Sequence, residues 1–266
     1  MIKQSLSRFY GRVHRRWSGR GFGWGLFTWF HFRVWERFLK PQSMVYEGVR
    51  LSLPEGDRVF STLLLLGNKY EGEVLEALHG ALKPGMTFLD LGANIGLHSV
   101  FAAQRVGPQG QVFAFEPFPA NIELLMRNLR QNHCSNVTVF PYAVGNRLEC
   151  RSLFLAEDSP ARHALQHRPS LGPKKTLPVV VVALAEFFRE PVLFDVVKID
   201  VEGAELEALQ GMAPFLQQPQ LRMLIVESHP EVLQELRMTG REIPDLLEKY
   251  GFRSQQLDPT NLLFTR

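Results

Sequence analysis

The segment Thr87–Gly96, with the sequence TFLDLGANIG, constrains the fold more than any other part of the chain. It begins as an apolar run of strand length that contains Asp90 near its end, and it passes through a glycine turn into a helix predicted over Leu97–Arg105. Gly92 lets the backbone leave the strand sharply, and Gly96 lets the helix start close to the sheet with its N–H groups facing a ligand. This order of strand, turn and helix predicts an α/β fold with a nucleotide-like ligand at the strand end.

A second acid follows the turn at the distance expected for a ribose-binding side chain. The apolar run Gln111–Glu116 predicts a strand that ends in Glu116, about 20 residues past the turn, where a carboxylate accepts hydrogen bonds from ribose hydroxyls. Asp90 can accept hydrogen bonds from an ammonium or hydroxyl group. Asn94 stands where a dinucleotide-binding turn has a glycine, so no pyrophosphate is expected. The residues therefore favour S-adenosylmethionine over NAD as the cofactor.

Further blocks make the chain resemble the FkbM-type family of S-adenosylmethionine-dependent methyltransferases. The resemblance reaches from about Tyr70 to Glu227 and rests on FLDLGANIG (88–96), AFEP (114–117), Asn128-Leu129 with Asn132, AVG (143–145), KIDVEGAE (198–205) and IVE (225–227). It implies a class I (Rossmann-like) methyltransferase fold with a seven-stranded, mostly parallel sheet. It also implies O-methylation of a hydroxyl of a sugar, glycan, glycolipid or related natural product.

The resemblance assigns three more residues to the cofactor. In the family, a tyrosine and an acid precede the helix before the glycine turn and close over the methionine end of the cofactor, which corresponds to Tyr70 and Glu71 here. Ala143 lies where this fold brings backbone groups to the adenine. An acid near a helix N-terminus also interacts favourably with the helix dipole, which is the alternative interpretation of Glu71.

The segment Lys198–Glu202 carries the candidate catalytic residues. Alternation along a strand places Lys198 and Asp200 on one side of its end, beside the crevice where ligands bind in open α/β sheets. Asp200 is the candidate base, Lys198 would orient the acceptor hydroxyl or stabilise the forming alkoxide, and Glu202 would complete a polar cluster with Glu227. No metal ligand is predicted, although these carboxylates could alternatively hold a divalent cation, and His229 is an alternative base.

Residues 1–40 differ in composition from the remainder of the chain. They contain nine basic side chains against one acid and all four tryptophans, while the net charge of the whole chain is only +3. Tryptophan with arginine is typical of a membrane interface, so the segment predicts either peripheral membrane contact or a pair of helices that covers the site. Nucleic acid is not an expected partner, because its reader motifs are missing. A cytosolic methyl donor predicts a cytoplasmic protein, at most peripheral at the inner membrane surface.

The expected organisation has three parts. Residues 1–43 form the basic extension, residues 44–82 form a small hairpin and a helix, and residues 83–266 form the catalytic domain. The hairpin is expected over 44–66 with Pro54–Asp57 as a turn, and Glu157–Lys175 is expected to be a long loop. Buried parallel strands are expected at Val179–Val182 and Leu193–Ile199, and a strand pair over 252–264 closes the sheet. The alternative functions are an NAD-dependent oxidoreductase and a membrane-recruited module without turnover.

Overall fold

The computed structural model describes residues 43–54, 71–156, 163–166, 175–190 and 192–266. The predictions for the basic extension and for Tyr70 lie outside the described residues, as does most of the predicted loop at 157–175. Membrane contact through residues 1–40 and a cytoplasmic location therefore stay predictions. Within the described ranges, no helix is both long enough and apolar enough to cross a membrane.

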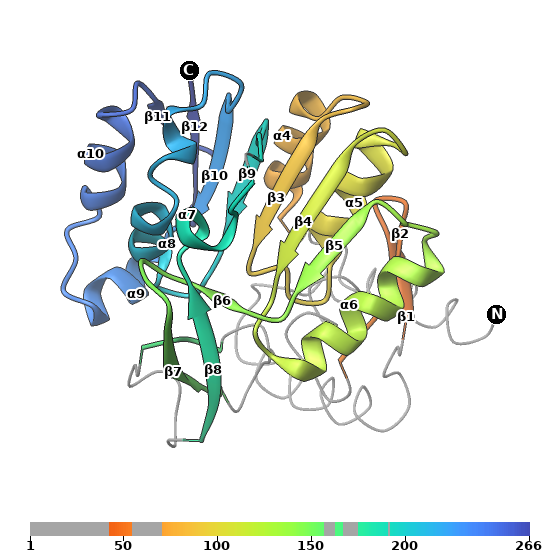
Figure 1. The fold of residues 1–266 in the computed structure, drawn as a ribbon, viewed down its shortest axis with the longest axis horizontal. Coiled ribbons are helices and arrows are strands. Elements are labelled where there is room, and N and C mark those ends of the chain that lie inside the picture. The colour runs from red at the N-terminus through yellow and green to blue at the C-terminus, as the bar shows by residue number, and fades with distance from the viewer. Residues whose placement is uncertain (1–42, 55–70, 157–162, 167–174, 191) are drawn as a thin grey trace, which may run out of the picture.

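A seven-stranded sheet forms the centre of the molecule, in the order β11-β12-β10-β9-β3-β4-β5 (Figure 1). The five strands from β10 to β5 run parallel to one another, and β12 runs antiparallel to both β10 and β11. The predicted parallel sheet with a closing antiparallel pair is thus confirmed. The strands are β3 (Thr87–Leu91), β4 (Gln111–Phe115), β5 (Val137–Phe140), β9 (Val196–Ile199), β10 (Met223–Glu227), β11 (Arg253–Gln256) and β12 (Asn261–Thr265).

Helices cover both faces of this sheet and bury two separate cores (Figure 1). The helices are α4 (Gly72–Ala81), α5 (Leu97–Val106), α6 (Pro119–Gln131), α7 (Leu184–Phe187), α8 (Glu205–Gly211), α9 (Pro230–Glu235) and α10 (Glu242–Glu248), with the short 3₁₀ helix η4 (Phe215–Gln217). In β3, Phe88 belongs to the core under α4 and α5, whereas Leu89 and Leu91 belong to the core under α7 and α8. Because side chains alternate along a strand, Asp90 must point to the α4–α5 face.

A small hairpin is present at the start of the predicted segment 44–66. Strands β1 (Ser43–Tyr46) and β2 (Val49–Ser52) pair so that Tyr46 faces Val49. Glu47 and Gly48, with φ of +46° and +82°, form the turn between these strands, and the turn predicted at Pro54–Asp57 lies outside the described residues except for Pro54. Positive φ at both central residues is the geometry that suits the right-handed twist of a two-residue hairpin.

Asn128 of α6 ties this hairpin to the glycine turn. Its side chain is fully buried; Oδ1 accepts the Ser52 N–H at 2.7 Å, and Nδ2 donates to the Ile95 carbonyl at 2.7 Å. One buried amide therefore satisfies backbone groups from two segments that are far apart in the sequence.

A three-stranded sheet, β6-β8-β7, projects beside the carboxyl edge of the main sheet (Figure 1). Its strands are β6 (Ala143–Val144), β7 (Glu149–Phe154) and β8 (Thr176–Val182). The prediction of a buried parallel strand at Val179–Val182 was wrong in part, because β8 lies outside the main sheet, pairs antiparallel with β7 over Thr176–Val181 and pairs in parallel only with the two residues of β6. Val180 is 37% exposed, so the valine run does not have two buried faces.

Candidate functional site

The glycine turn packs between the ends of strands β4 and β9. The N–H groups of Gly92 and Ala93 both donate to the Phe115 carbonyl, at 3.0 and 2.9 Å, and the Asp200 N–H donates to the Leu91 carbonyl at 2.9 Å. Gly92 has a φ of +84°, and a Cβ atom there would lie 1.7 Å from the Asp200 carbonyl oxygen. No side chain fits at this position without moving the backbone, which explains the glycine.

Two further residues of the turn also have positive φ. Asn94 has a φ of +50°, a conformation that asparagine tolerates better than most residues. Gly96 has a φ of +89° and immediately precedes α5. A Cβ atom on Gly96 would lie 2.3 Å from a methyl group of Leu125, so this glycine also lets α5 approach α6.

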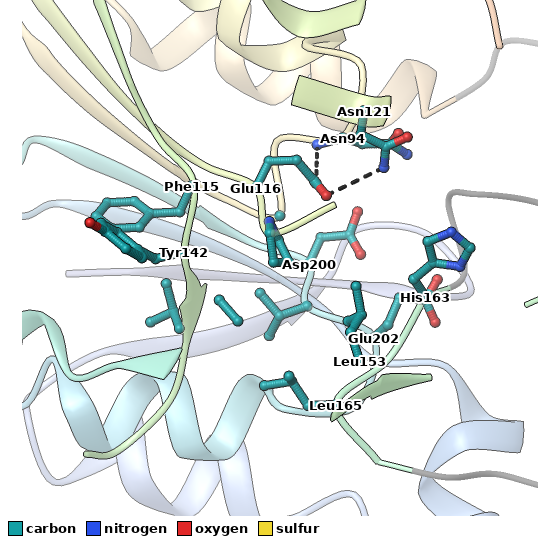
Figure 2. A pocket seen from close by; sticks show the side chains of 15 residues that line it. Asn94, Phe115, Glu116, Asn121, Tyr142, Leu153, His163, Leu165, Asp200 and Glu202 are labelled. Atoms are coloured by element: carbon teal, nitrogen blue, oxygen red, sulfur yellow. Dashed lines mark hydrogen bonds between the residues drawn. The ribbon is translucent and has the colours of Figure 1, made fainter. Parts of the chain in front are cut away.

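A pocket opens where the turn meets the ends of β4 and β9 (Figure 2). Six of the predicted site residues line it, together with residues of β6 and β7 and their neighbours. The described lining consists of Gly92, Asn94, Phe115, Glu116, Pro117, Asn121, Tyr142, Ala143, Val144, Leu153, His163, Leu165, Asp200, Val201 and Glu202. The predicted residues that do not line it are Asp90, Gly96, Glu71 and Lys198, which lie behind or beside the turn.

Glu116 is held rigidly at the pocket wall. One carboxylate oxygen accepts the Asn94 N–H at 2.8 Å, and the other accepts the Phe118 N–H at 2.9 Å and the Asn121 side-chain amide at 3.4 Å (Figure 2). The residue is only 5% exposed. Burial raises the pKa of Glu116 to about 7, although the two backbone hydrogen bonds act in the opposite direction.

Behind the turn, a buried cluster of charges surrounds Lys198. This lysine is 1% exposed, stands opposite Asp90 in the register of β9 and β3, and contacts Asp200 Oδ2 through Nζ at 2.8 Å. Burial lowers its pKa, but the facing carboxylates of Asp200, Glu71 and Asp90 outweigh this, so its pKa lies above the ordinary value. Lys198 is therefore charged, buried and paired with these acids.

Two acids of this cluster are linked to α5. Glu71 Oε2 lies 2.9 Å from His98 Nε2 and 3.9 Å from Lys198 Nζ. The Ser99 hydroxyl donates to Asp90 Oδ2 at 2.5 Å, whereas Asp90 Oδ1 is buried without a hydrogen-bond partner among the described residues. Burial raises the pKa of Asp90, while His98 and Lys198 outweigh burial at Glu71, where the pKa is lowered. Glu71 thus does more than interact with a helix dipole, since it contacts the cluster directly.

Asp200 connects the buried cluster to the pocket. Its side chain is 20% exposed and lines the cavity, and it also forms a hydrogen bond with the side chain of Glu227. Burial raises the pKa of Asp200, but the Lys198 charge and these hydrogen bonds outweigh burial and hold the pKa below its ordinary range. Burial and the neighbouring Asp200 raise the pKa of Glu227 well above its ordinary value.

Glu205 has a local structural role. Its Oε1 accepts the N–H groups of Val201 and Gly203 at 3.2 and 2.9 Å, which closes the loop before α8. It is 8% exposed and does not line the pocket.

Sequence reasoning missed three polar or aromatic residues of the pocket. Asn121 lies in the first turn of α6, five residues after Glu116, so its proximity to that acid could have been expected. Tyr142 lies two residues after the end of β5. His163 comes from the segment between β7 and β8; its Nδ1 accepts the Ala156 N–H at 3.0 Å, and its ring packs edge-on against Phe118 with centroids 4.3 Å apart. No local pattern around His163 predicts its place.

The sheet order, the glycine turn after β3 and the acid after β4 define a class I methyltransferase fold. The model of the "Methyltransferase FkbM domain" matches residues 90–254, which is more than half of the chain. The protein therefore belongs to the FkbM methyltransferase family.

The chain is similar in sequence to several methyltransferases over part of their length. A "Hexuronic acid methyltransferase AglP" of Haloferax volcanii is 30% identical over 162 residues, covering 61% of this chain and 64% of the relative. "Methyltransferase 1" of Beauveria bassiana is 27% identical over 143 residues, covering 47% of this chain and 57% of the relative. The chain thus spans less than two thirds of either relative. The crystal structure of methyltransferase FkbM from Methylobacillus flagellatus superposes with a TM-score of 0.47 at 16% identity, covering 77% of this chain and 52% of that one.

Proposed function

We propose that this protein uses S-adenosylmethionine to O-methylate a hydroxyl group of a sugar, glycan, glycolipid or related natural product. The observation that carries this proposal is the charge of the pocket. Its described lining contains three carboxylates, Glu116, Asp200 and Glu202, and neither lysine nor arginine. S-adenosylmethionine carries a sulfonium and an ammonium group and no phosphate, so it suits such a lining.

NAD fits the same lining poorly. A pyrophosphate binds to backbone N–H groups at a helix N-terminus, next to a turn whose glycines allow close approach. Here the Asn94 N–H donates to Glu116, so a carboxylate takes one of the donors of the turn. The family match also favours methyl transfer over an oxidoreductase.

In this proposal, residues of the glycine turn and residues after β4 and at β6 would bind the cofactor. Glu116, fixed by two backbone N–H groups, would accept hydrogen bonds from the ribose hydroxyls, and Ala143 would border the adenine. Gly92 and Asn94 leave room along the turn, and Gly96 shapes the start of α5. When bound, the cofactor supplies a methyl group on a positively charged sulfur.

Asp200 would accept the hydrogen bond of the acceptor hydroxyl and take its proton as the new C–O bond forms. Its lowered pKa keeps it ionised and ready to accept, but it also makes it a weak base, so alignment of the hydroxyl contributes a large share of the rate. Lys198 is enclosed and contacts Asp200, so we assign it to holding this carboxylate in place. Glu202 would contact the acceptor at the pocket rim.

The name of the Haloferax relative supports a sugar-type acceptor, because that protein is called a hexuronic acid methyltransferase. Glu71 belongs to the buried cluster and does not line the pocket, so it would act on the ammonium end of the cofactor through its charge and not by contact.

Transfer of an isotope-labelled methyl group tests the proposal. The full chain is incubated with labelled S-adenosylmethionine and a panel of glycosides, including uronic acids, and the products are identified by mass. We expect Asp200→Asn to lower the transfer rate roughly 100-fold or more while S-adenosylmethionine affinity changes little. Glu231→Gln, an exposed acid on α9, is the matched control. Failure to bind S-adenosylmethionine, or an equal rate in Asp200→Asn, would contradict the proposal.

A further inference from the structure

Glu202, Glu227 and His229 bring three metal-ligand atoms together at the carboxyl edge of the sheet. One carboxylate oxygen from each acid and one ring nitrogen lie within 4.8 Å of one another, and Glu227 Oε1 and His229 Nε2 are 3.1 Å apart. Glu227 ends β10, His229 precedes α9, and Glu202 follows β9, so two neighbouring parallel strands position the group. We propose that these residues bind a first-row divalent cation such as Mn²⁺ or Zn²⁺.

The distances suit such an ion after small side-chain movements. Metal bonds to histidine nitrogen and carboxylate oxygen are about 2.0–2.2 Å long, which places neighbouring ligands roughly 3 Å apart. The Glu227 and His229 atoms already have this separation. Glu202 borders the pocket, and its ligand atom lies within 4.8 Å of those of Glu227 and His229.

The kinds of donor select the class of metal. Calcium and magnesium prefer oxygen ligands only, whereas an imidazole nitrogen with two carboxylates suits first-row ions. The presence of His229 is therefore what separates this group from an ordinary cluster of acids. His229 is 33% exposed and Glu227 12% exposed on their side chains, so an ion can enter from solvent and still be partly shielded.

The neighbourhood of these three ligands is rich in acids, which would favour a bound cation. Lys198 already faces four carboxylates, those of Asp200, Glu71, Asp90 and Glu227. Asp200 and Glu227 are in direct contact, and Glu202 adds a further acid on the same edge. Lys198 and His98 offset part of this negative charge, and a divalent ion beside Glu227 would offset more of it.

At this position the ion would also take part in binding the acceptor. This part of the inference rests on the proposed function. Three protein ligands leave open positions toward the pocket that Glu202 and Asp200 border. Two oxygens of the acceptor, such as adjacent hydroxyls or a carboxylate, would occupy these positions. The ion would then hold one hydroxyl near Asp200 and make it more acidic, which compensates for the weakness of Asp200 as a base.

The competing explanation is a simple ion pair between Glu227 and His229 with no metal. Mn²⁺ titration of the metal-free full chain, with free Mn²⁺ followed by electron paramagnetic resonance, separates the two. We expect one Mn²⁺ per chain, displaced by Zn²⁺, and a loss of affinity of roughly ten-fold or more in both Glu227→Gln and His229→Gln. Glu231→Gln, with the same change of charge on α9, should bind as the wild type does.

S-adenosylmethionine binding by the same samples keeps the test independent of folding. His229→Gln changes a partly exposed side chain, so it should retain cofactor binding even if Glu227→Gln is unstable. A wild-type chain that binds S-adenosylmethionine but no Mn²⁺ would overturn the metal site and leave the proposed function intact. Equal Mn²⁺ affinity in the wild type and His229→Gln would also overturn it. Mn²⁺ binding lost in His229→Gln, in a chain that binds no S-adenosylmethionine, would support the site and refute the function.

Discussion

Replacement of Gly92 by alanine should be far more damaging than replacement of Gly251, although both glycines have a φ of +84°. At Gly251 a Cβ atom would meet no other atom within 4 Å, whereas at Gly92 it would lie 1.7 Å from the Asp200 carbonyl oxygen. The two variants share the same backbone strain. Their difference therefore measures the contact between the glycine turn and the end of β9.

The magnitudes follow from this pairing. A left-handed alanine costs about 1–2 kcal/mol, and reduced freedom of the unfolded chain returns about 0.4–1 kcal/mol, so Gly251→Ala should lose about 1 kcal/mol of unfolding free energy. Gly92→Ala adds overpacking, typically about 1–3 kcal/mol, because the opposing atom belongs to the backbone and cannot rotate away. Its total loss should be about 2–4 kcal/mol.

Urea unfolding followed by circular dichroism measures both losses, and titration with S-adenosylmethionine measures the effect on the site. Gly92→Ala should lose cofactor affinity because relief of the overlap moves the pocket wall, while Gly251→Ala should keep it. If the two variants lost the same free energy within about 0.5 kcal/mol, the close packing of the turn against β9 would be refuted.

Three further predictions concern buried polar groups. Lys198→Met should lower the unfolding free energy by about 3–5 kcal/mol because it leaves enclosed acids unpaired; a loss below about 1 kcal/mol in urea unfolding would contradict the account of the cluster. Asn128→Leu should lose about 2–4 kcal/mol, since the Ser52 N–H and Ile95 carbonyl lose their partner, and wild-type stability would argue against this link. The raised pKa of Glu116, about 7, means that the folded state binds a proton more tightly than the unfolded state. Its contribution to stability is present below the unfolded pKa and is lost as pH rises through 7, by up to about 3 kcal/mol. Thermal unfolding between pH 4.5 and 8 should show this fall in stability, and an equally steep fall in Glu116→Gln would contradict the prediction. The pKa of Glu205 is also raised to about 7, so part of the fall should persist in Glu116→Gln.

The parallel strands and the turn could be predicted because their signals are local. Asp90, Gly92 and Glu116 stand at fixed distances along one strand-turn-helix-strand unit, and the structure places them accordingly. The contact of Lys198 with Asp200 likewise follows from alternation along one strand. Such features depend on a few neighbouring residues, which the sequence displays directly.

The errors arose where distant segments decide the outcome. The valines of β8 resemble a buried parallel strand, but pairing with β7, which no local pattern reveals, places them in a separate sheet. The turn at Glu47-Gly48, which follows from the pairing of Tyr46 with Val49, was not predicted either. The contact of Glu71 with His98 joins α4 to α5, and the place of His163 in the pocket depends on the same kind of long-range packing.

Isothermal titration of the full chain with S-adenosylmethionine, S-adenosylhomocysteine and NADH tests the central claim most directly. We expect the wild type to bind the first two and not NADH, and we expect Glu116→Ala and Asp90→Ala to weaken that binding strongly while Glu231→Gln leaves it unchanged. Binding of NADH alone, or S-adenosylmethionine binding that Glu116→Ala does not alter, would contradict the account of the pocket.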